Sequence, residues 1–268
     1  MIKSHSRKLR LRTTLVVPFV AQLIITVGLV GYLSFINGQK AVNDLADQLN
    51  TQISSRIEQH VMDYLNKSQH TLLLTNMSVK SGNLDLQDFT KLRRYFWQIV
   101  HRGESEGYVL YGNEQGEFVG VEYQDNGTVQ LKIRTKTTEP LRRTYLLDQK
   151  GEPEKLLTTA KYDTTTRPWY KAAKQAKKPT WSEIYPFFSR KNTVLGISPV
   201  YPILDNNNQM LGVLSINIRL TQITDFINNL FVSTNGQSFI IERSGNLVAS
   251  SKIPQPFKVI GTGDNRTI

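Results

Sequence analysis

Residues 15–36, LVVPFVAQLIITVGLVGYLSFI, are the stretch that decides how this chain is organised. They lie inside a longer interval, residues 13–39 between Arg12 and Lys40, that contains no charged residue. A helix rises about 1.5 Å per residue, so these residues are long enough to cross the hydrocarbon core of a bilayer, about 30 Å thick. Pro18 is expected in the first turns, where its missing N–H costs little. The stretch therefore predicts a transmembrane anchor.

The residues before this stretch set its orientation. Residues 1–14 form a basic flank without any acidic residue. The positive-inside rule keeps such a flank in the cytoplasm, so everything after about residue 37 is expected outside. We therefore expect a single-pass protein of the inner (plasma) membrane whose bulk is extracytoplasmic. The basic residues of the flank are Lys3, Arg7, Lys8, Arg10 and Arg12.

A cleaved signal peptide is the alternative interpretation of residues 15–36. The apolar part of a signal peptide is normally about 7–15 residues long and is followed by a small-x-small cleavage site. Here the apolar stretch is longer, and no clean site follows Ile36. The pattern favours an uncleaved anchor.

Composition argues against several functional classes. The 268 residues include no cysteine, which excludes disulfides, thiolate catalysis and cysteine metal sites. The net charge is +11, but there is no basic stripe with interleaved aromatic residues of the kind that binds nucleic acid. The histidines have no ligand-like spacing and no Ser/His/Asp grouping can be defended, so we expect no metal site, no cofactor and no catalytic centre. The histidines are His5, His60, His70 and His101.

A long amphipathic helix is expected over residues 37–82. Its apolar residues recur every three or four positions, and neither Pro nor Gly interrupts the pattern from Val42 until Gly82. The stripe can pack on the chain's own domain or on a second copy, so a homodimer through this helix is one expectation. The stripe consists of Val42, Leu45, Leu49, Ile53, Ile57, Val61 and Leu65.

The rest of the chain has the pattern of an α+β fold. Short apolar strands alternate with turn signals, and a few longer segments have helical spacing. Helices are expected over residues 86–102, 163–178 and 221–231. Strands are expected over residues 107–111, 117–123, 128–135, 141–147, 193–202 and 210–219, and a hairpin over residues 238–249.

A weak internal repeat connects two of these hairpins. Residues 116–120, GEFVG, are similar to residues 245–249, GNLVA, and each follows an apolar strand and a polar turn. The repeat suggests two related modules, over residues 83–231 and 232–268. A hairpin cannot bury its apolar face alone, so we expect the second module to be incomplete and the chain to be a truncated piece, or a natural remnant, of a longer protein.

One motif carries a resemblance to a known family. The pattern Tyr-x4-Arg-x-Trp-Tyr-x2-Ala is formed by Tyr162, Arg167, Trp169, Tyr170 and Ala173. With residues 181–185, 196–202, 212–218 and 239–245, the chain resembles the double Cache sensor family over most of residues 37–250. The resemblance implies two PAS-like modules stacked on a long N-terminal helix, of which the second is truncated here. It also implies a sensor that feeds histidine kinases, nucleotide cyclases or chemoreceptors across the membrane.

The residue types of this motif fit a small-molecule site. The Arg167 guanidinium is a planar fork of donors that matches a carboxylate in two parallel bonds. Trp169 and Tyr170 add flat apolar faces with one donor each, and Tyr162 and Tyr185 could supply further hydroxyls. Two or three charge-assisted contacts would support affinity in the micromolar range. We therefore expect binding of a small molecule, with a carboxylate as the favoured group.

The resemblance also bears on which ligand this chain prefers. The amino-acid-binding subset of the family uses two aspartates for the ligand's ammonium group, and the matching positions here are Phe187 and Asn217. An ammonium group buried there would lack its partners, at a cost of about 1–3 kcal/mol or more. A free amino acid is therefore not the expected ligand, and a carboxylate without an amine, or a different small molecule, fits better. Asn217 remains a candidate site residue.

Each candidate has a plainer structural interpretation. Arg167 could pair with Asp163 or Glu183 and only fasten a loop. Trp169 and Tyr170 could be core aromatics. Asp163 and Glu183 could be paired carboxylates of a glycosidase type, although nothing else favours an enzyme. At the level of the chain, a structural module that dimerises through its long helix is the main alternative to a sensor.

Overall fold

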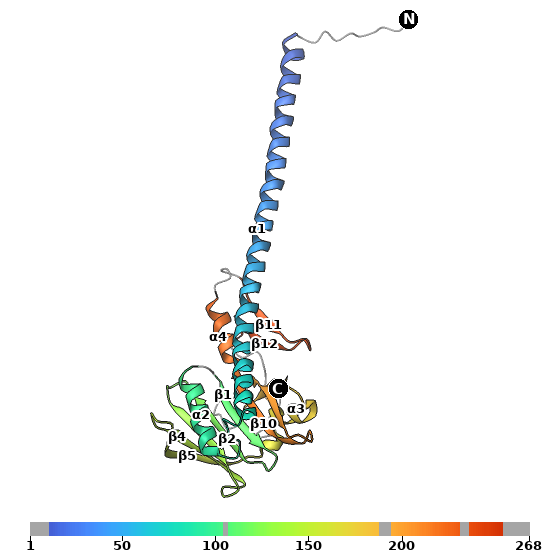
Figure 1. Ribbon diagram of the computed structural model, residues 1–268. Helices are drawn as coiled ribbons and strands as arrows, with labels where there is room; N and C mark the ends of the chain where they lie inside the picture. Colours follow the sequence, from blue (N-terminus) through green and yellow to red (C-terminus); the bar gives the residue numbers. More distant parts are fainter. Residues whose placement is uncertain (1–10, 104–106, 188–193, 231–235, 254–268) are drawn as a thin grey trace. The chain divides into compact units, whose positions relative to one another are not determined.

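The computed structural model describes residues 11–103, 107–187, 194–230 and 236–253 (Figure 1). The chain divides into two units, Met1–Glu58 and Gln59–Ile268. Helix α1 (Leu11–Lys80) begins in the first unit and ends in the second. Because α1 begins at Leu11, Pro18 lies about two turns inside it, beyond the first turn in which a missing N–H costs little. Its ring removes one backbone hydrogen bond from the helix.

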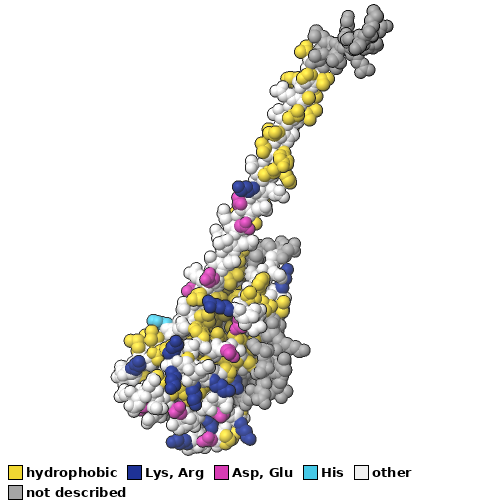
Figure 2. Space-filling model, turned by 90° about the vertical axis from the view of Figure 1, so that its right-hand side faces the viewer, with side chains coloured by type: hydrophobic (Ala, Val, Ile, Leu, Met, Phe, Trp, Pro, Cys, Tyr) yellow, Lys and Arg dark blue, Asp and Glu magenta, His cyan; other side chains and the backbone are white. Residues whose placement is uncertain are grey.

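In the first unit, the apolar stretch of α1 is exposed on all sides. The large apolar side chains from Leu15 to Ile36 have exposed fractions of 41–67%. Figure 2 shows hydrophobic side chains along this part of the helix, and charged side chains appear only beyond it on the face in view. One helix among the described residues is long and apolar enough to cross a membrane by length and composition, and it contains this stretch.

The second unit is built around an antiparallel sheet. Its main path runs in the order β5-β4-β3-β2-β1-β10-β8-β7, and β9 pairs with β10 and with β6. The strands are β1 (Tyr108–Asn113), β2 (Phe118–Tyr123), β3 (Val129–Arg134), β4 (Leu141–Leu147), β5 (Pro153–Lys161), β6 (Thr180–Trp181), β7 (Tyr185–Pro186), β8 (Leu195–Ile197), β9 (Pro199–Leu204) and β10 (Met210–Arg219).

Both faces of the central strands are covered, which places the core on two sides of the sheet. Helix α2 (Phe89–His101) packs Leu92 and Phe96 against one face, with the end of α1. Helix α3 (Pro168–Ala176) and the loop before it cover the other face. Strand β1 shows the consequence. Val109 packs in the core on the α2 side of the sheet, and the next residue, Leu110, packs in the core on the α3 side. On a strand that is buried on both faces, a polar side chain is costly unless it has a hydrogen-bond or charged partner.

The same turn closes five of the hairpins in this unit. In each, a residue at the turn's start bonds the backbone of the residues three and four positions later, and the fourth residue has a positive φ. Such turns need a residue that tolerates the left-handed conformation, which explains Gly at four of the positions and Asn208 at the fifth. Residues 113–116 and 205–208 form two of these turns. The five positive-φ residues are Gly116, Gly127, Gly151, Asn208 and Gly245.

Several expected elements differ in detail. Strand β5 was not expected. The helix expected over residues 163–178 is a 3-10 turn η1 (Thr164–Thr166) followed by α3, because Pro168 starts a new helix at its first position. The strand expected over residues 193–202 is divided into β8 and β9, and its first residue lies outside the described residues.

The end of the described chain forms a separate small sheet. Among the described residues, strands β11 (Phe239–Ile241) and β12 (Leu247–Ser250) pair only with each other, and helix α4 (Thr221–Asn229) packs against β12. Phe231, the last residue of the helix expected over residues 221–231, lies outside the described residues. The α+β class, the long N-terminal helix and the antiparallel sheet with flanking helices agree with expectation.

Candidate functional site

A diagonal row of polar and aromatic side chains crosses the centre of the sheet. Asn217 of β10 is the register partner of Tyr108 of β1, which is the partner of Glu122 of β2. Lys132 of β3 and Arg142 of β4 continue the row by diagonal steps. Partners across an antiparallel pair, and residues two apart along a strand, share one face of a sheet. All five side chains therefore lie on the face that α3 covers.

Gly120 makes room in the middle of this row. It lies two residues before Glu122 on β2, and a Cβ atom there would be 2.6 Å from the Tyr108 ring. The absence of a side chain therefore lets the Tyr108 ring lie over the strand. The Lys132 ammonium group lies 4.6 Å from the centre of that ring, in cation–π geometry.

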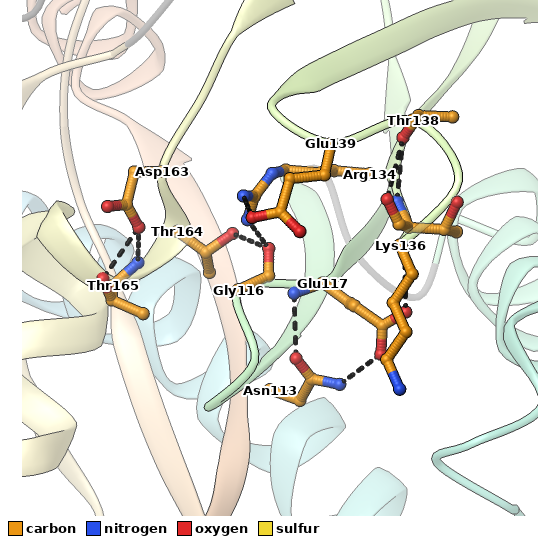
Figure 3. Close-up of polar contacts among 11 residues, drawn as sticks. Asn113, Gly116, Glu117, Arg134, Lys136, Thr138, Glu139, Asp163, Thr164 and Thr165 are labelled. Atoms are coloured by element: carbon orange, nitrogen blue, oxygen red, sulfur yellow. Dashed lines mark hydrogen bonds and ion pairs between the residues drawn. The ribbon is translucent and has the colours of Figure 1, made fainter.

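Arg167 reaches the same space from the loop that precedes α3. Asp163 caps the η1 turn by accepting hydrogen bonds from the Thr165 backbone and hydroxyl, at 2.9 and 2.7 Å. The Thr164 hydroxyl donates to the Gly116 carbonyl at 3.3 Å, and Arg134 donates to the same carbonyl (Figure 3). The turn between β1 and β2 thus fixes the loop from which Arg167 extends.

The same corner is tied together by a second set of bonds in Figure 3. The Asn113 side chain accepts from the Glu117 backbone and donates to the Glu117 carboxylate, both at 2.8 Å. That carboxylate also accepts from the Lys136 backbone at 3.2 Å. Arg134 donates to Glu139 at 2.7 Å. These bonds belong to the framework, and none of these residues lines the cavity described next.

The row of side chains and Arg167 line a small cavity whose lining residues are all buried. Its volume is about 20 Å³, which is room for about one water molecule. A larger ligand therefore requires the lining side chains to move apart. The described residues that line it are Tyr108, Glu122, Lys132, Arg142, Tyr162, Arg167, Trp169, Tyr185, Phe187 and Asn217.

The charges in this lining are predominantly positive. Lys132, Arg142 and Arg167 are cations and Glu122 is the one anion in this set of described residues, and all four side chains are buried. The Lys132 ammonium lies 2.5 Å from the Glu122 carboxylate. Burial and the positive charge of Arg142 lower the pKa of Lys132 to about 7, while the Glu122 carboxylate favours its charged form. The Arg142 guanidinium lies 4.5 Å from the centre of the Tyr162 ring.

Hydroxyl groups hold the Asn217 amide in place. Its carbonyl oxygen accepts from Ser198 at 2.8 Å and from the Tyr185 hydroxyl at 3.2 Å. The remaining polar group of the amide is its NH2, which only donates. Burial raises the pKa of Tyr185 above its usual range, so this hydroxyl stays protonated at neutral pH. The NH2 group of Asn217 therefore suits an electron-rich partner.

The structure brings together five of the six candidate residues. Tyr162, Arg167, Trp169, Tyr185 and Asn217 line the cavity. Tyr170 is not in the described lining; it is buried beside Trp169, with ring centres 5.6 Å apart, and its hydroxyl has no hydrogen-bond partner among the described residues. This placement agrees with the plainer interpretation of Tyr170 as a core aromatic.

The placement of Arg167 also bears on its plainer interpretation, in which it pairs with Asp163 or Glu183 and only fastens a loop. The Asp163 carboxylate caps the η1 turn, as described above. The Arg167 guanidinium donates to the Pro186 carbonyl at 3.5 Å, so it contacts the strand that carries Tyr185. Its side chain is buried and lines the cavity, which is the position that anion binding requires.

Four lining residues were missed in the sequence: Tyr108, Glu122, Lys132 and Arg142. Three of them are charged and lie on alternating positions of strands, a pattern that equally describes a face in water. One feature of the sequence could have indicated them. They lie on the apolar strand β1 or on the strands that follow it in the sheet, and an apolar central strand indicates that the centre of the sheet is covered on both faces. Phe187, noted as the replacement of a family aspartate, lies in the lining, as does Asn217 at the other such position.

Comparison with known families identifies one match over most of the chain. A family model described as Cache domain (dCache_1) matches residues 38–267. The methyl-accepting chemotaxis protein McpC of Bacillus subtilis (strain 168) is 36% identical over 91 residues, which are 33% of this chain and 13% of that protein. This chain therefore covers only a small part of the length of that relative.

Comparison with solved structures finds chemoreceptor domains. The ligand-binding domain of Campylobacter jejuni chemoreceptor Tlp3 in complex with L-valine has a TM-score of 0.48 and 14% identity, covering 81% of this chain and 75% of that one. The ligand-binding domain of Pseudomonas aeruginosa PAO1 amino acid chemoreceptor PctC in complex with GABA has a TM-score of 0.47 and 18% identity, covering 74% and 72%.

Proposed function

Because this chain belongs to the dCache_1 family of Cache domains, we propose that it is the membrane-anchored, extracytoplasmic sensor part of a bacterial signalling receptor and that its ligand is a small organic anion. The observation that carries the choice of ligand is the buried cavity, whose described lining holds three cations and one carboxylate. The NH2 group of the Asn217 amide adds a donor to that lining. An anion would find charge-assisted partners there without having to bring its own counter-ion.

The two positions that lack a carboxylate support an anion over an amino acid. Phe187 is buried and apolar, and the Asn217 carbonyl oxygen already accepts two hydrogen bonds. An ammonium group beside them would lose its water without gaining a charged partner. Glu122 is the one described acid in the lining, and it already pairs with Lys132.

The proposed organisation follows the membrane anchor. Residues 1–14 are cytoplasmic, residues 15–36 cross the membrane once, and residues 37–82 form the helix that leaves it. Residues 83–231 are the PAS-like sensor module, and residues 232–268 belong to a second, membrane-proximal PAS-like module. The exposed apolar side chains of residues 15–36 support this assignment, because water would disfavour them.

Signalling would proceed by a choice between two arrangements of the sensor module. A ligand shifts such an equilibrium only by its difference in affinity for the two arrangements. Asn217 lies near the end of β10, and α4 follows that strand directly. Helix α4 contacts α1 through the stacked rings of His60 and Phe226, 3.6 Å apart. A change at the cavity therefore has a short path to α1, and a chemoreceptor, kinase or cyclase would lie downstream in a complete receptor.

Isothermal titration of the full chain in lipid nanodiscs tests the proposal. The ligands are a panel of small carboxylic acids, with L-valine and GABA as amine-bearing comparisons. We expect a carboxylate to bind with an affinity in the micromolar range, and Arg167→Gln to weaken it by about tenfold or more. Arg167→Lys keeps the charge but not the planar fork, so it should bind between the two. Wild-type affinity in Arg167→Gln, or stronger binding of L-valine than of every acid, would contradict the proposal.

A dimerising module without a ligand is the second candidate function. Three residues of the predicted stripe, Val42, Leu45 and Leu49, are exposed in the first unit, where a second helix could cover them. Analytical ultracentrifugation of the full chain in detergent would show a dimer that Leu45→Glu and Leu49→Glu dissolve. This candidate replaces the first only if the dimer forms and no acid of the panel binds.

A further inference from the structure

Phe187 differs from the rest of the described cavity lining in its chemistry. Within that set of residues, it is the one whose side chain has no polar atom. Its side chain can therefore form no conventional hydrogen bond with a ligand, and what it contributes is the volume that its ring occupies. The residue is buried, with an exposed fraction of 5%, and its backbone N–H donates to the Val194 carbonyl at 2.9 Å.

The Phe187 ring lies against the backbone of β8. Gly196 of that strand pairs with Tyr185, two residues before Phe187, so Phe187 and Gly196 are diagonal neighbours on one face of the β7–β8 hairpin. A Cβ atom at Gly196 would overlap the far end of the Phe187 ring and the Ile218 carbonyl oxygen. Glycine is therefore required at this position for the ring to lie where it does.

The surroundings of the ring hold it in the cavity. The Tyr185 ring packs edge-on beside it, with ring centres 5.3 Å apart, and the Tyr185 hydroxyl is itself hydrogen-bonded to Ser198 and Asn217. On the side of Gly196, close-packed backbone atoms leave no space into which a ligand could push the ring. A ligand must therefore fit beside the Phe187 ring and cannot replace it.

We infer that Phe187 sets the size of the ligand: its ring fills the part of the cavity next to Gly196 and restricts the ligand to a short acid without a ring. The inference rests on the proposed function and names the residue that determines specificity within it. The space left beside the ring is about 20 Å³, so even a short acid requires the long charged side chains of the lining to move. An aromatic acid would also need the space that the Phe187 ring occupies.

Acids of different size test the inference on the full chain in nanodiscs. Acetate, propionate and butyrate are compared with benzoate and phenylacetate by isothermal titration at constant ionic strength. We expect the wild-type chain to bind one of the short acids more tightly than either aromatic acid, by about tenfold or more, because a phenyl group gains affinity only where it can be buried.

Phe187→Ala should reverse this preference. It leaves an apolar space against Gly196, and an apolar cavity created by a large-to-small substitution can bind a molecule the size of benzene. The ring of benzoate or phenylacetate would take the place of the missing side chain, so the affinity for one of them should rise by about tenfold or more over the wild-type chain. Phe96→Ala is the matched control, since it removes an equally buried phenyl ring from α2, on the other face of the sheet. It should leave the preference for short acids unchanged.

The outcomes separate this inference from the function on which it rests. If the wild-type chain binds aromatic acids as tightly as short ones, or if Phe187→Ala keeps the wild-type preference, the inference is overturned and the proposed anion sensor stands. An equal gain in Phe96→Ala would also overturn it, because a loosened core would then explain the gain. If no acid binds to any of these chains, both fall. Should Phe187→Ala fail to fold, Phe187→Leu serves instead: its smaller side chain should raise the affinity for benzoate, and an unchanged affinity would overturn the inference.

Discussion

At the scale of single residues, Gly151 closes the turn between β4 and β5 in a conformation that combines two constraints. Its φ is +78°, and a Cβ atom there would lie 2.7 Å from the Trp97 ring. Gly127 has nearly the same φ, +81°, but its nearest neighbour would be the Tyr123 hydroxyl at 3.7 Å. Substitutions at Gly127 and Gly151 therefore separate the cost of backbone strain, present at both positions, from the cost of a steric conflict with Trp97, present only at Gly151.

We predict that Gly127→Ala lowers the free energy of unfolding by about 1–2 kcal/mol, the cost of a left-handed residue with a side chain. Gly151→Ala should cost clearly more, because Trp97 must also move. Urea denaturation of the full chain in detergent, followed by tryptophan fluorescence, measures both. Equal losses would show that the Trp97 ring gives way at no cost.

Residue identity alone predicted part of the candidate site. The motif around Arg167 indicated three lining residues, Tyr162, Arg167 and Trp169, because its residue types are unusual together, and Tyr185 and Asn217 came from other segments of the family resemblance. Lys132 and Arg142 could not be found in this way. A charged residue at every second position of a strand gives the same sequence pattern whether that face of the sheet is exposed to water or lines a cavity. Tyr170 was included because it belongs to the same motif and offers a flat face and a hydroxyl donor, yet it follows Trp169 directly, and successive residues of a helix point in different directions. What decides these cases is which face is covered, and that depends on distant parts of the chain.

At the scale of elements, the turns were the most predictable feature. Gly and Asn mark positions of positive φ, so the ends of β4 and β10 agree with expectation at both termini. Strand β5 was missed because it starts with Pro153 and is exposed along most of its length at the edge of the sheet, so its residues show no alternation. The likeness of residues 116–120 and 245–249 also has a plainer interpretation, because both stretches begin at the fourth residue of the turn that recurs in five hairpins; the two modules remain a prediction.

The contact between α4 and α1 provides a prediction at this scale. His60 and Phe226 stack with ring planes 11° apart. We expect a double-mutant cycle with His60→Ala and Phe226→Ala to give a coupling energy of about 0.5–1.5 kcal/mol in the free energy of unfolding. Met62→Ala replaces His60→Ala in the control cycle, since Met62 is exposed on the same helix. A coupling near zero in the first cycle would remove this stack from the path between the cavity and α1.

At the scale of the whole molecule, the proposed topology has a clean test because the chain has no cysteine. A single cysteine can be placed at Ser6 or at Ser81 and reacted with a membrane-impermeant maleimide on bacterial spheroplasts. We predict that Ser81→Cys is labelled from outside and that Ser6→Cys is labelled only after permeabilisation, on a chain of full size. Protection of Ser81→Cys would place the sensor module in the cytosol, and loss of the Ser6→Cys segment would indicate a cleaved signal peptide.

The small volume of the cavity has a consequence for time as well as for affinity. Under the proposed function, a cavity with space for about one water molecule would take up its ligand only while the lining is open, and would release it only when the lining opens again. At high concentration, uptake would then follow the opening rate and level off in stopped-flow measurements. A receptor built on this domain would average the ligand concentration over the interval between two openings. Changes in concentration faster than that interval would not alter its output.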